Sequence, residues 1–527
     1  MNKKNFIFLL SLFLLNLIFR ANVITAVQDY VPTNFDINHS PKNILVSSYT
    51  GGRSHLKPML DIAAILVERG HNVILLTSGN YTPASEYPTI KQISMGPPLS
   101  IKGLKFAANL IEKDVEFTMF TTIFERNLES YKRAFEKYKE TAIDNNIDLF
   151  ICYAIMNDAC LDVAHALKKP VVGFMSFLNV LETTTYKSDP VFRCKNSLEN
   201  ESLLERLKCT VIQPLRLYSS LYPVLNKLND IRLQMGVEPV DMSLKRLIKT
   251  SLIFVDAFFG FELPQTLPPN ILEIGPIMSK EYPPLTPELS DFINGHKRDM
   301  VDGVIWALSQ TSKEDFSLTL NLTDGSQIQT ASILNNEHPH VLITEFAPQF
   351  AVLNHTNTKL FFSHGGVASV HESLFTGTPL LILPIGGDQM GNAEKLKIAG
   401  VALSLNKFDL EVDDIINKIN ILLKDEDIKK NIERMKGLAK VNSRRKYRAA
   451  DLIEYMLYRN DLNIDSNQEL KEFVPADKRM GFIRGNNYDV YGIILGFVGG
   501  TLWIIFKLIR FIVRKISPSS KQKPKRE

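Results

Sequence analysis

The chain of 527 residues is 45% hydrophobic and 22% charged, with a formal net charge of +4. This is the composition of a globular protein long enough for at least two hydrophobic cores, which excludes a disordered chain and a single small domain. The basic charge comes from the two ends: residues 507–527 carry +7 and residues 1–26 carry +3, so about −6 remains for everything between. The charge therefore indicates membrane flanks and not a nucleic-acid surface.

The first 26 residues have the pattern of a cleaved secretory signal. Lys3 and Lys4 precede a short apolar run that is interrupted by Arg20. The segment ends in small residues near Ala26. Five Asn-x-Ser/Thr triplets would accept glycans if they were exposed in the lumen, at Asn38, Asn80, Asn200, Asn321 and Asn354. Such triplets also occur by chance, so the alternative is that several carry no glycan.

The next segment predicts a strand–helix–strand unit. An apolar strand starts at Ile44, a turn follows at Gly51-Gly52, a helix runs from about Leu56 to Gly70, and a second strand covers 73–76. His55 is expected in the loop above the carboxyl end of the first strand, where open α/β sheets bind their ligands. A capping role in the turn is the alternative for this histidine.

The strand and helix alternation continues to a proline-rich linker. The run 148–154 reads as a strand followed by a helix and another strand, and 252–277 contains Pro264, Pro268 and Pro269, as a linker does. Cys194 and Cys209 flank a polar segment and are expected to close it as a disulfide. Similar alternation after the linker predicts two doubly wound halves around a cleft.

The segment from Phe361 to Asn392 concentrates polar groups at the ends of two strands. Gly365 and Gly366 let the backbone approach a ligand, and the helix that follows offers its free amides to a phosphate. Side chains that suit a phosphate or sugar hydroxyls follow at His364, Ser369, Glu372, Asp388 and Gln389. The combination favours a ligand that carries a phosphate and sugar hydroxyls.

The carboxyl end predicts one membrane span. Residues 490–506 are uncharged, and apolar residues beyond Lys507 extend the run to 512. The basic tail after it places that end in the cytosol and the bulk of the chain in the lumen. Lys523 and Lys525 have the spacing of a dilysine signal for retrieval to the endoplasmic reticulum, and a plain basic flank is the alternative.

These motifs resemble the UDP-glycosyltransferases of the glucuronosyltransferase and plant natural-product type. The resemblance is carried by "FAPQFAVLNHTNTKLFFSHGGVASVHESLFTGTPLLILPIGGDQMGNAEKLKIAGVALSL", by Ser54-His55, by "PPNILEIGPI", and by the signal and membrane anchor. It implies an α/β GT-B fold, with two doubly wound Rossmann-like domains facing a cleft and one C-terminal transmembrane helix. The implied divisions are a signal at 1–26, an acceptor domain at 27–275, a UDP-sugar domain at 276–445, a returning helix and juxtamembrane segment at 446–489, a transmembrane helix at 490–512 and a cytosolic tail at 513–527.

The resemblance also implies a role for each matching residue. His55 corresponds to the catalytic base of an inverting transfer, in which the acceptor oxygen attacks the anomeric carbon. The donor would be held by Phe346 at the uracil, Gln349 at the uridine, His364, Gly366 and Ser369 at the diphosphate, Glu372 at the ribose, and Asp388 with Gln389 at the transferred sugar. UDP-sugar is then a co-substrate, and neither a metal nor another cofactor is implied.

Two positions depart from the family pattern. The family orients its histidine with an aspartate, and the matching place here holds Tyr153 or Ala154. Asp158, one helical turn further on, is the candidate replacement, although it also suits a helix start. In the second half Gln310 replaces a phosphate-loop glycine, and Thr311 alone keeps a hydroxyl for the phosphates.

Three functions stay open at this stage. The favoured one is a lumenal, single-pass type I enzyme of the endoplasmic reticulum membrane. It would transfer a hexose or hexuronic acid from a UDP-sugar to a lipophilic alcohol such as a sterol. The first alternative is a non-catalytic binder of a nucleotide sugar or lipid, and the second is an epimerase acting on the nucleotide sugar. No nucleic-acid partner is expected, and a homo-oligomer is left open.

Overall fold

A computed structural model describes the protein, and it covers residues 40–48, 52–78, 86–96, 117–176, 194, 201–240, 243–264, 266–296, 301–308, 316–322, 325–459, 470 and 472–516. Residues 42–527 form one compact unit, in which the two expected halves are both recognisable. The signal segment, the phosphate-loop position Thr311 and the tail with Lys523 and Lys525 lie outside the described residues.

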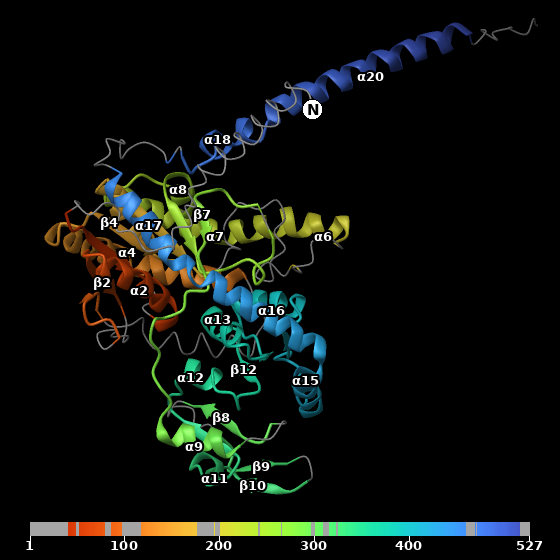
Figure 1. The fold of residues 1–527 in the computed structure, drawn as a ribbon. Helices are drawn as coiled ribbons and strands as arrows, with labels where there is room; N and C mark the ends of the chain where they lie inside the picture. Colours follow the sequence, from red (N-terminus) through yellow and green to blue (C-terminus); the bar gives the residue numbers. More distant parts are fainter. Residues whose placement is uncertain are drawn as a thin grey trace, which may run out of the picture. The chain divides into compact units, whose positions relative to one another are not determined.

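A seven-stranded parallel sheet organises the first half (Figure 1). Its strands are β1 (Asn43–Ser47), β2 (Asn72–Thr77), β3 (Lys91–Ser94), β4 (Leu149–Tyr153), β5 (Val171–Met175), β6 (Leu252–Val255) and β7 (Ile271–Glu273), in the spatial order β3-β2-β1-β4-β5-β6-β7. The order reverses between β1 and β4, so the carboxyl ends of these two strands border the crevice where doubly wound sheets bind ligands.

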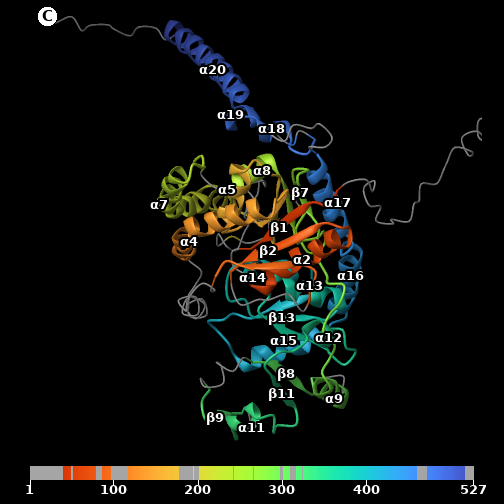
Figure 2. The same cartoon turned by 90° about the vertical axis from the view of Figure 1, so that its left-hand side faces the viewer.

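Helices cover both faces of this sheet, as the continuous apolar strands require. Alternate residues of β1 point to opposite faces: Ile44 and Val46 pack with α2 (Arg53–Glu68) and α17 (Arg445–Tyr458), whereas Leu45 packs with α4 (Phe117–Asp144) and α5 (Asp158–Ala166). Figure 2 shows the two helical layers on either side of β1 and β2. The remaining helical segments of this half are α6 (Leu203–Leu207), the π-helical η3 (Lys208–Ile212), α7 (Gln213–Gln234) and α8 (Ser243–Thr250).

The segment expected as a linker contributes two strands to this sheet. Within 252–277, β6 pairs with β5 and β7 pairs with β6, on either side of the prolines. The prolines lie between the strands, where no ladder hydrogen bond is required. The linker prediction is therefore wrong for β6 and β7, because pairing at the sheet edge outweighs the local proline content.

The second half carries its strands in smaller groups. β8 (Val304–Ala307) pairs in parallel with β11 (Val341–Thr344), and β12 (Phe361–Ser363), β13 (Leu380–Ile382) and β14 (Ala402–Ser404) form a second parallel group. An antiparallel pair that was not expected joins β9 (Thr319–Asn321) and β10 (Gln327–Gln329). The helices are α9 (Pro287–Gly295), α11 (Thr330–Leu334), α12 (Gln349–Leu353), α13 (Val367–Thr376), α14 (Gln389–Ile398), α15 (Val412–Lys424) and α16 (Glu426–Asn442).

One described helix is long and apolar enough to cross a membrane. It is α20 (Tyr488–Ile516), which follows the short α18 (Ala476–Arg479) and α19 (Phe482–Gly485), and none of its residues is buried. It encloses the span expected at 490–512 in one uninterrupted helix. The domain boundaries expected from the sequence stay predictions.

Two disulfides fix parts of the first half. The expected pair, Cys194 with Cys209, is confirmed. A second pair was not expected: Cys152 at the end of β4 is bonded to Cys160 in the first turns of α5. This bond closes the turn that leaves the sheet at the β1/β4 crevice. Of the predicted glycan acceptors, Asn321 and Asn354 are exposed, whereas Asn38, Asn80 and Asn200 lie outside the described residues.

A buried charge network joins α4, α5 and α7. Arg232 is fully buried, and it donates from Nε to Asp162 at 2.7 Å and from Nη2 to Asp158 at 3.1 Å. Asp162 also accepts from the Tyr131 hydroxyl at 2.7 Å and from Arg246 at 3.0 Å. Burial of an arginine at this depth is tolerated only because these acceptors surround it.

We expect Asp162→Ala to lower the free energy of unfolding by about 3–5 kcal/mol, because it leaves the buried Arg232 charge short of partners. Urea denaturation of the full chain, followed by circular dichroism, measures the change. The matched control is Lys137→Ala, which removes the exposed pair with Glu140 on α4 and should cost less than about 0.5 kcal/mol. Equal losses in the two variants would contradict a structural role for the network.

Candidate active site

His55 lies in the first turn of α2 and not in the preceding loop, because the helix begins at Arg53. The backbone N–H of His55 donates to the Gly52 carbonyl at 3.1 Å. Its ring lies 4.9 Å from the Tyr153 ring, centroid to centroid, at 84°. The buried Nδ1 atom has no hydrogen-bond partner among the described residues. Burial lowers the pKa of His55 and the nearby Asp388 carboxylate opposes this, so the neutral imidazole that a general base needs is favoured.

Asp158 does not orient His55, and this prediction is wrong. Its two carboxylate oxygens accept from Arg232 at 3.1 Å and from Asn127 at 2.9 Å. The Cys152–Cys160 disulfide also fixes the start of α5, so the turn is not free to bring Asp158 towards the histidine. The buried arginine is a stronger attraction for the carboxylate than a neutral imidazole, and the sequence alone gave no sign of it.

The glycine-rich loop before α13 has the geometry expected of an anion site. Gly365 has φ +85°, and a Cβ atom there would lie 2.8 Å from the side chain of Ile382. Gly366 is the N-cap of α13, and His364 beside it is exposed. Only glycine fits at Gly365, and the helix amides that follow are directed at the space above the loop.

Three of the predicted donor residues form one hydrogen-bonded chain. Gln349 donates from Nε2 to Glu372 at 2.7 Å, and the Ser369 hydroxyl donates to Gln349 Oε1 at 3.3 Å. Phe346 lies just before α12, which begins at Gln349, and is 59% exposed. The structure thus brings these side chains together as the sequence predicted, while their contacts with uridine stay predictions.

Asp388 and Gln389 are placed by a second set of contacts. Asn392 is buried and donates from Nδ2 to Asp388 at 3.0 Å and to the Gly365 carbonyl at 3.0 Å. Gln389 accepts through Oε1 from the backbone N–H groups of Ile385 and Gly386, at 2.8 and 3.1 Å. Burial raises the pKa of Asp388, and the hydrogen bond from Asn392 and the charge of His55 oppose this rise. The carbonyl oxygen of Gln389 therefore supports its own loop, and Asp388 interacts electrostatically with His55.

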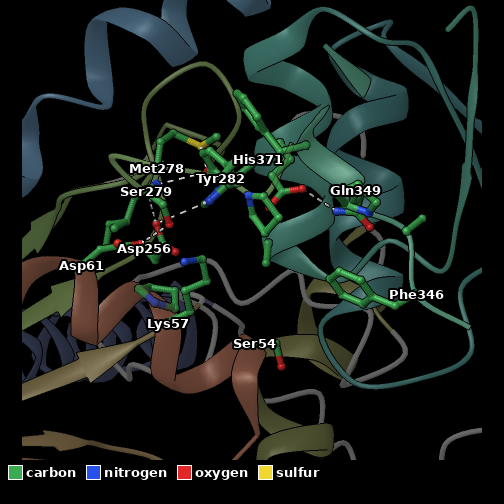
Figure 3. Close-up of a pocket in the computed structure, with 18 residues that line it drawn as sticks. Ser54, Lys57, Asp61, Asp256, Met278, Ser279, Tyr282, Phe346, Gln349 and His371 are labelled. Atoms are coloured by element: carbon green, nitrogen blue, oxygen red, sulfur yellow. Dashed lines mark hydrogen bonds and ion pairs between the residues drawn. The ribbon is translucent and has the colours of Figure 1, made fainter. Parts of the chain in front are cut away.

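A cavity of about 460 Å³ lies between α2 and α13 (Figure 3). Residues from three parts of the chain line it. They are Lys57 and Asp61 of α2, Asp256 directly after β6 with Ser279 and Tyr282 after β7, and Phe346, Gln349, His371 and Glu372 of the second half. A volume of this size suits a nucleotide-sized ligand. The predicted uridine-binding residues thus share one cavity with groups of the first half.

Buried ionisable groups that sequence reasoning missed also line the cavity. Asp61 accepts from the hydroxyls of Tyr87 and Ser279, each at 2.7 Å. Asp256 Oδ1 lies 3.4 Å from Nδ1 of His371, and burial raises the pKa of Asp256 to about 7 and lowers that of His371 to about 3. The only signal in the sequence was the position of His371, directly before Glu372.

In the described part of the chain, no group of three or more histidine, cysteine, aspartate or glutamate side chains is arranged to hold a metal ion. The expectation that catalysis needs no metal stays a prediction.

The comparisons with known proteins agree with this architecture. A calicheamicin glycosyltransferase has the same fold, with a TM-score of 0.53 and 19% identity over 80% of this chain and 99% of its own. A UDP-glucosyltransferase from Polygonum tinctorium gives a TM-score of 0.52 and 17% identity over 80% of this chain and 99% of its own. The fold is therefore the GT-B fold of these glycosyltransferases.

The family model for UDP-glucoronosyl and UDP-glucosyl transferases matches residues 43–523, so the chain belongs to that family. A UDP-glycosyltransferase of Talaromyces amestolkiae is 26% identical over 90% of this chain and 99% of its own length. UDP-glycosyltransferase 1 of Phaeomoniella chlamydospora is 35% identical, but the match covers 53% of this chain and 62% of that protein. A mouse UDP-glucuronosyltransferase is 25% identical over 52% of each chain. The protein is an enzyme that transfers sugar from a UDP-sugar.

We expect Glu372→Ala and Asp388→Ala each to weaken use of the UDP-sugar by about 2 kcal/mol or more, the usual cost of a lost buried polar contact. UDP binding should respond only to Glu372→Ala, because Asp388 is assigned to the sugar. Calorimetric titration with UDP and steady-state kinetics with the UDP-sugar measure the two effects. Normal binding and turnover in both variants would show that the assigned contacts are wrong.

Proposed function

We propose that this enzyme transfers a hexose or hexuronic acid to a hydroxyl of a lipophilic small molecule such as a sterol, with inversion at the anomeric carbon. The observation that carries the proposal is the placement of His55 after β1, at the β1/β4 crevice, close enough to Asp388 of the second half for that carboxylate to raise the pKa of the imidazole. A base from one half and a sugar-binding carboxylate from the other then flank the space between acceptor and donor.

The reaction needs three contributions from the chain. Neutral His55 takes the proton of the acceptor hydroxyl while that oxygen bonds to the anomeric carbon, from the face opposite UDP. The bond from the anomeric carbon to the UDP oxygen breaks, and its electron pair leaves with the diphosphate. The amides and dipole at the start of α13 stabilise that charge, with Gly366 keeping the approach open.

A lipophilic acceptor is supported by the surface of the first half. Helical segments from α6 through α7 expose a row of apolar side chains at Leu203, Leu207, Val211, Leu215, Tyr218 and Tyr222. The identity of the sugar is left to experiment, because Asp388 suits the hydroxyls of a hexose and of its uronic acid equally.

The proposed address is the membrane of the endoplasmic reticulum, with α20 as a single type I span and the two halves in the lumen. Two disulfides suit an oxidising compartment. Arg514 and Lys515, at the carboxyl end of α20, suit the cytosolic side. The proposed partners are a UDP-sugar, a lipophilic acceptor and the membrane.

A panel of labelled UDP-sugars, given to membranes containing the full chain with a mixed lipid acceptor pool, tests the activity. We expect one donor to label an organic-soluble product, and His55→Ala to reduce this labelling by at least ~100-fold because the general base is lost. UDP binding should be unchanged in that variant, since His55 is assigned to the acceptor hydroxyl and does not line the cavity that holds the predicted uridine-binding residues.

Three outcomes would contradict the proposal. Transfer at the normal rate in His55→Ala would show that His55 is not the general base. Release of an altered free UDP-sugar without acceptor would identify an epimerase. UDP binding without turnover of any donor would identify a non-catalytic binder.

Changing Lys523 and Lys525 to serine tests the address. We expect glycans on the parent protein to be sensitive to endoglycosidase H, and those on the variant to acquire later Golgi processing, because the dilysine signal is read in the cytosol. Identical glycans in parent and variant would show that the two lysines are a plain basic flank and not a retrieval signal. Digestion of the first half by protease added outside intact microsomes would show that the first half is cytosolic, against the proposed topology.

A further inference from the structure

His55 is held differently from a histidine that is paired with an acid. Its Nδ1 atom is buried and makes no hydrogen bond within the described residues. Among the described residues, the ring of Tyr153 packs against it, at 4.9 Å between centroids and nearly perpendicular. An imidazole with no partner on Nδ1 can rotate unless packing prevents it, and this ring contact is packing of that kind.

Tyr153 is itself rigidly placed. It ends β4, its side chain is 2% exposed, and its hydroxyl lies 3.0 Å from the Ser176 hydroxyl at the end of β5. Its ring also packs at 6.3 Å from that of Phe174. The preceding residue, Cys152, is bonded to Cys160, so the turn that follows Tyr153 is closed. A side chain restrained at the ring, the hydroxyl and the backbone can restrain its neighbour in turn.

We propose that Tyr153 is the positioning residue for His55, holding the imidazole by a perpendicular ring contact at the place where a carboxylate would otherwise hold it by a hydrogen bond. This inference rests on the proposed role of His55 as the base. A perpendicular aromatic contact fixes orientation but brings no negative charge to Nδ1. The titratable groups that the described structure places beside His55 are Tyr153 from β4 and Asp388 from the start of α14.

The absence of a charge on Nδ1 has a consequence for pH dependence. A carboxylate next to an imidazole stabilises its protonated form and raises its pKa, whereas burial lowers it. A base held by a ring alone stays neutral, and therefore active, to lower pH than a base paired with an acid. The fall in kcat/KM towards acid should accordingly move to higher pH when a carboxylate is placed at position 153.

Substitutions of Tyr153 in the full chain test the proposal. Tyr153→Leu should lower kcat about tenfold or more, with UDP binding and the KM for UDP-sugar within about twofold of the parent. Tyr153→Phe keeps the ring and should retain the parent kcat and pH profile. Tyr153→Asp should move the acidic limb of kcat/KM upward by about one pH unit.

The outcomes separate this inference from the function on which it rests. Normal transfer in His55→Ala would show that His55 is not the base. Loss of transfer in His55→Ala together with the parent kcat in Tyr153→Leu would leave His55 as the base and show that the ring contact does not position it. If the leucine variant does not fold, Tyr153→Phe decides: parent activity supports the ring, and a tenfold loss transfers the role to the hydroxyl and overturns the proposal. An acidic limb that stays in place in Tyr153→Asp also overturns it.

Discussion

The packing of α17 against the first sheet is the constraint on which the divided site depends. After completing the second half, the chain returns and buries Ala449, Leu452 and Ile453 in the same core as α2 and β1. Arg69 at the end of α2 bonds Asp451 at 2.8 Å and Glu454 at 2.5 Å, with little exposure on any of the three. Because α2 also carries His55, this tie couples the helix that bears the base to the half that binds the donor.

Electrostatics divides the work of catalysis between the halves. On one side is a partly buried imidazole whose pKa is lowered by burial, on a helix held by apolar packing, and on the other the start of α13 offers amides with a partial positive charge. Asp388, whose charge acts on His55, is itself restrained by Asn392. Such preorganised dipoles and uncharged groups cost little reorganisation when charge moves from the acceptor oxygen to the diphosphate.

What could be predicted from the sequence is what depends on neighbours along the chain. The β1–α2–β2 unit, the glycine loop before α13 and the apolar run of α20 are all short-range patterns, and all are present. The grouping of Gln349 with Glu372 also followed, through a resemblance that spans the donor segment.

The misses depend on residues far apart in the chain. Asp158 was expected near His55, yet Arg232 on α7 attracts it, and no local pattern announces a contact over 74 residues. The pairing of Cys152 with Cys160 and the approach of Asp256 to His371 likewise follow from where the strands end in space. The start of α2 was expected at about Leu56 but lies at Arg53, which places His55 inside the helix. Helix ends are uncertain by one or two residues in any case.

The Cys152–Cys160 bond forms only under oxidising conditions, so the covalent closure of the turn beside Tyr153 depends on where the chain folds. In a reducing cytosol the two thiols would remain separate and the turn after Tyr153 would lose its covalent closure, while the second half, from 276 onward, contains no cysteine that could be affected directly. Protein made in such a compartment should therefore still bind nucleotide yet transfer sugar poorly. Production in a secretory host, or in a strain with an oxidising cytoplasm, would keep the two properties together.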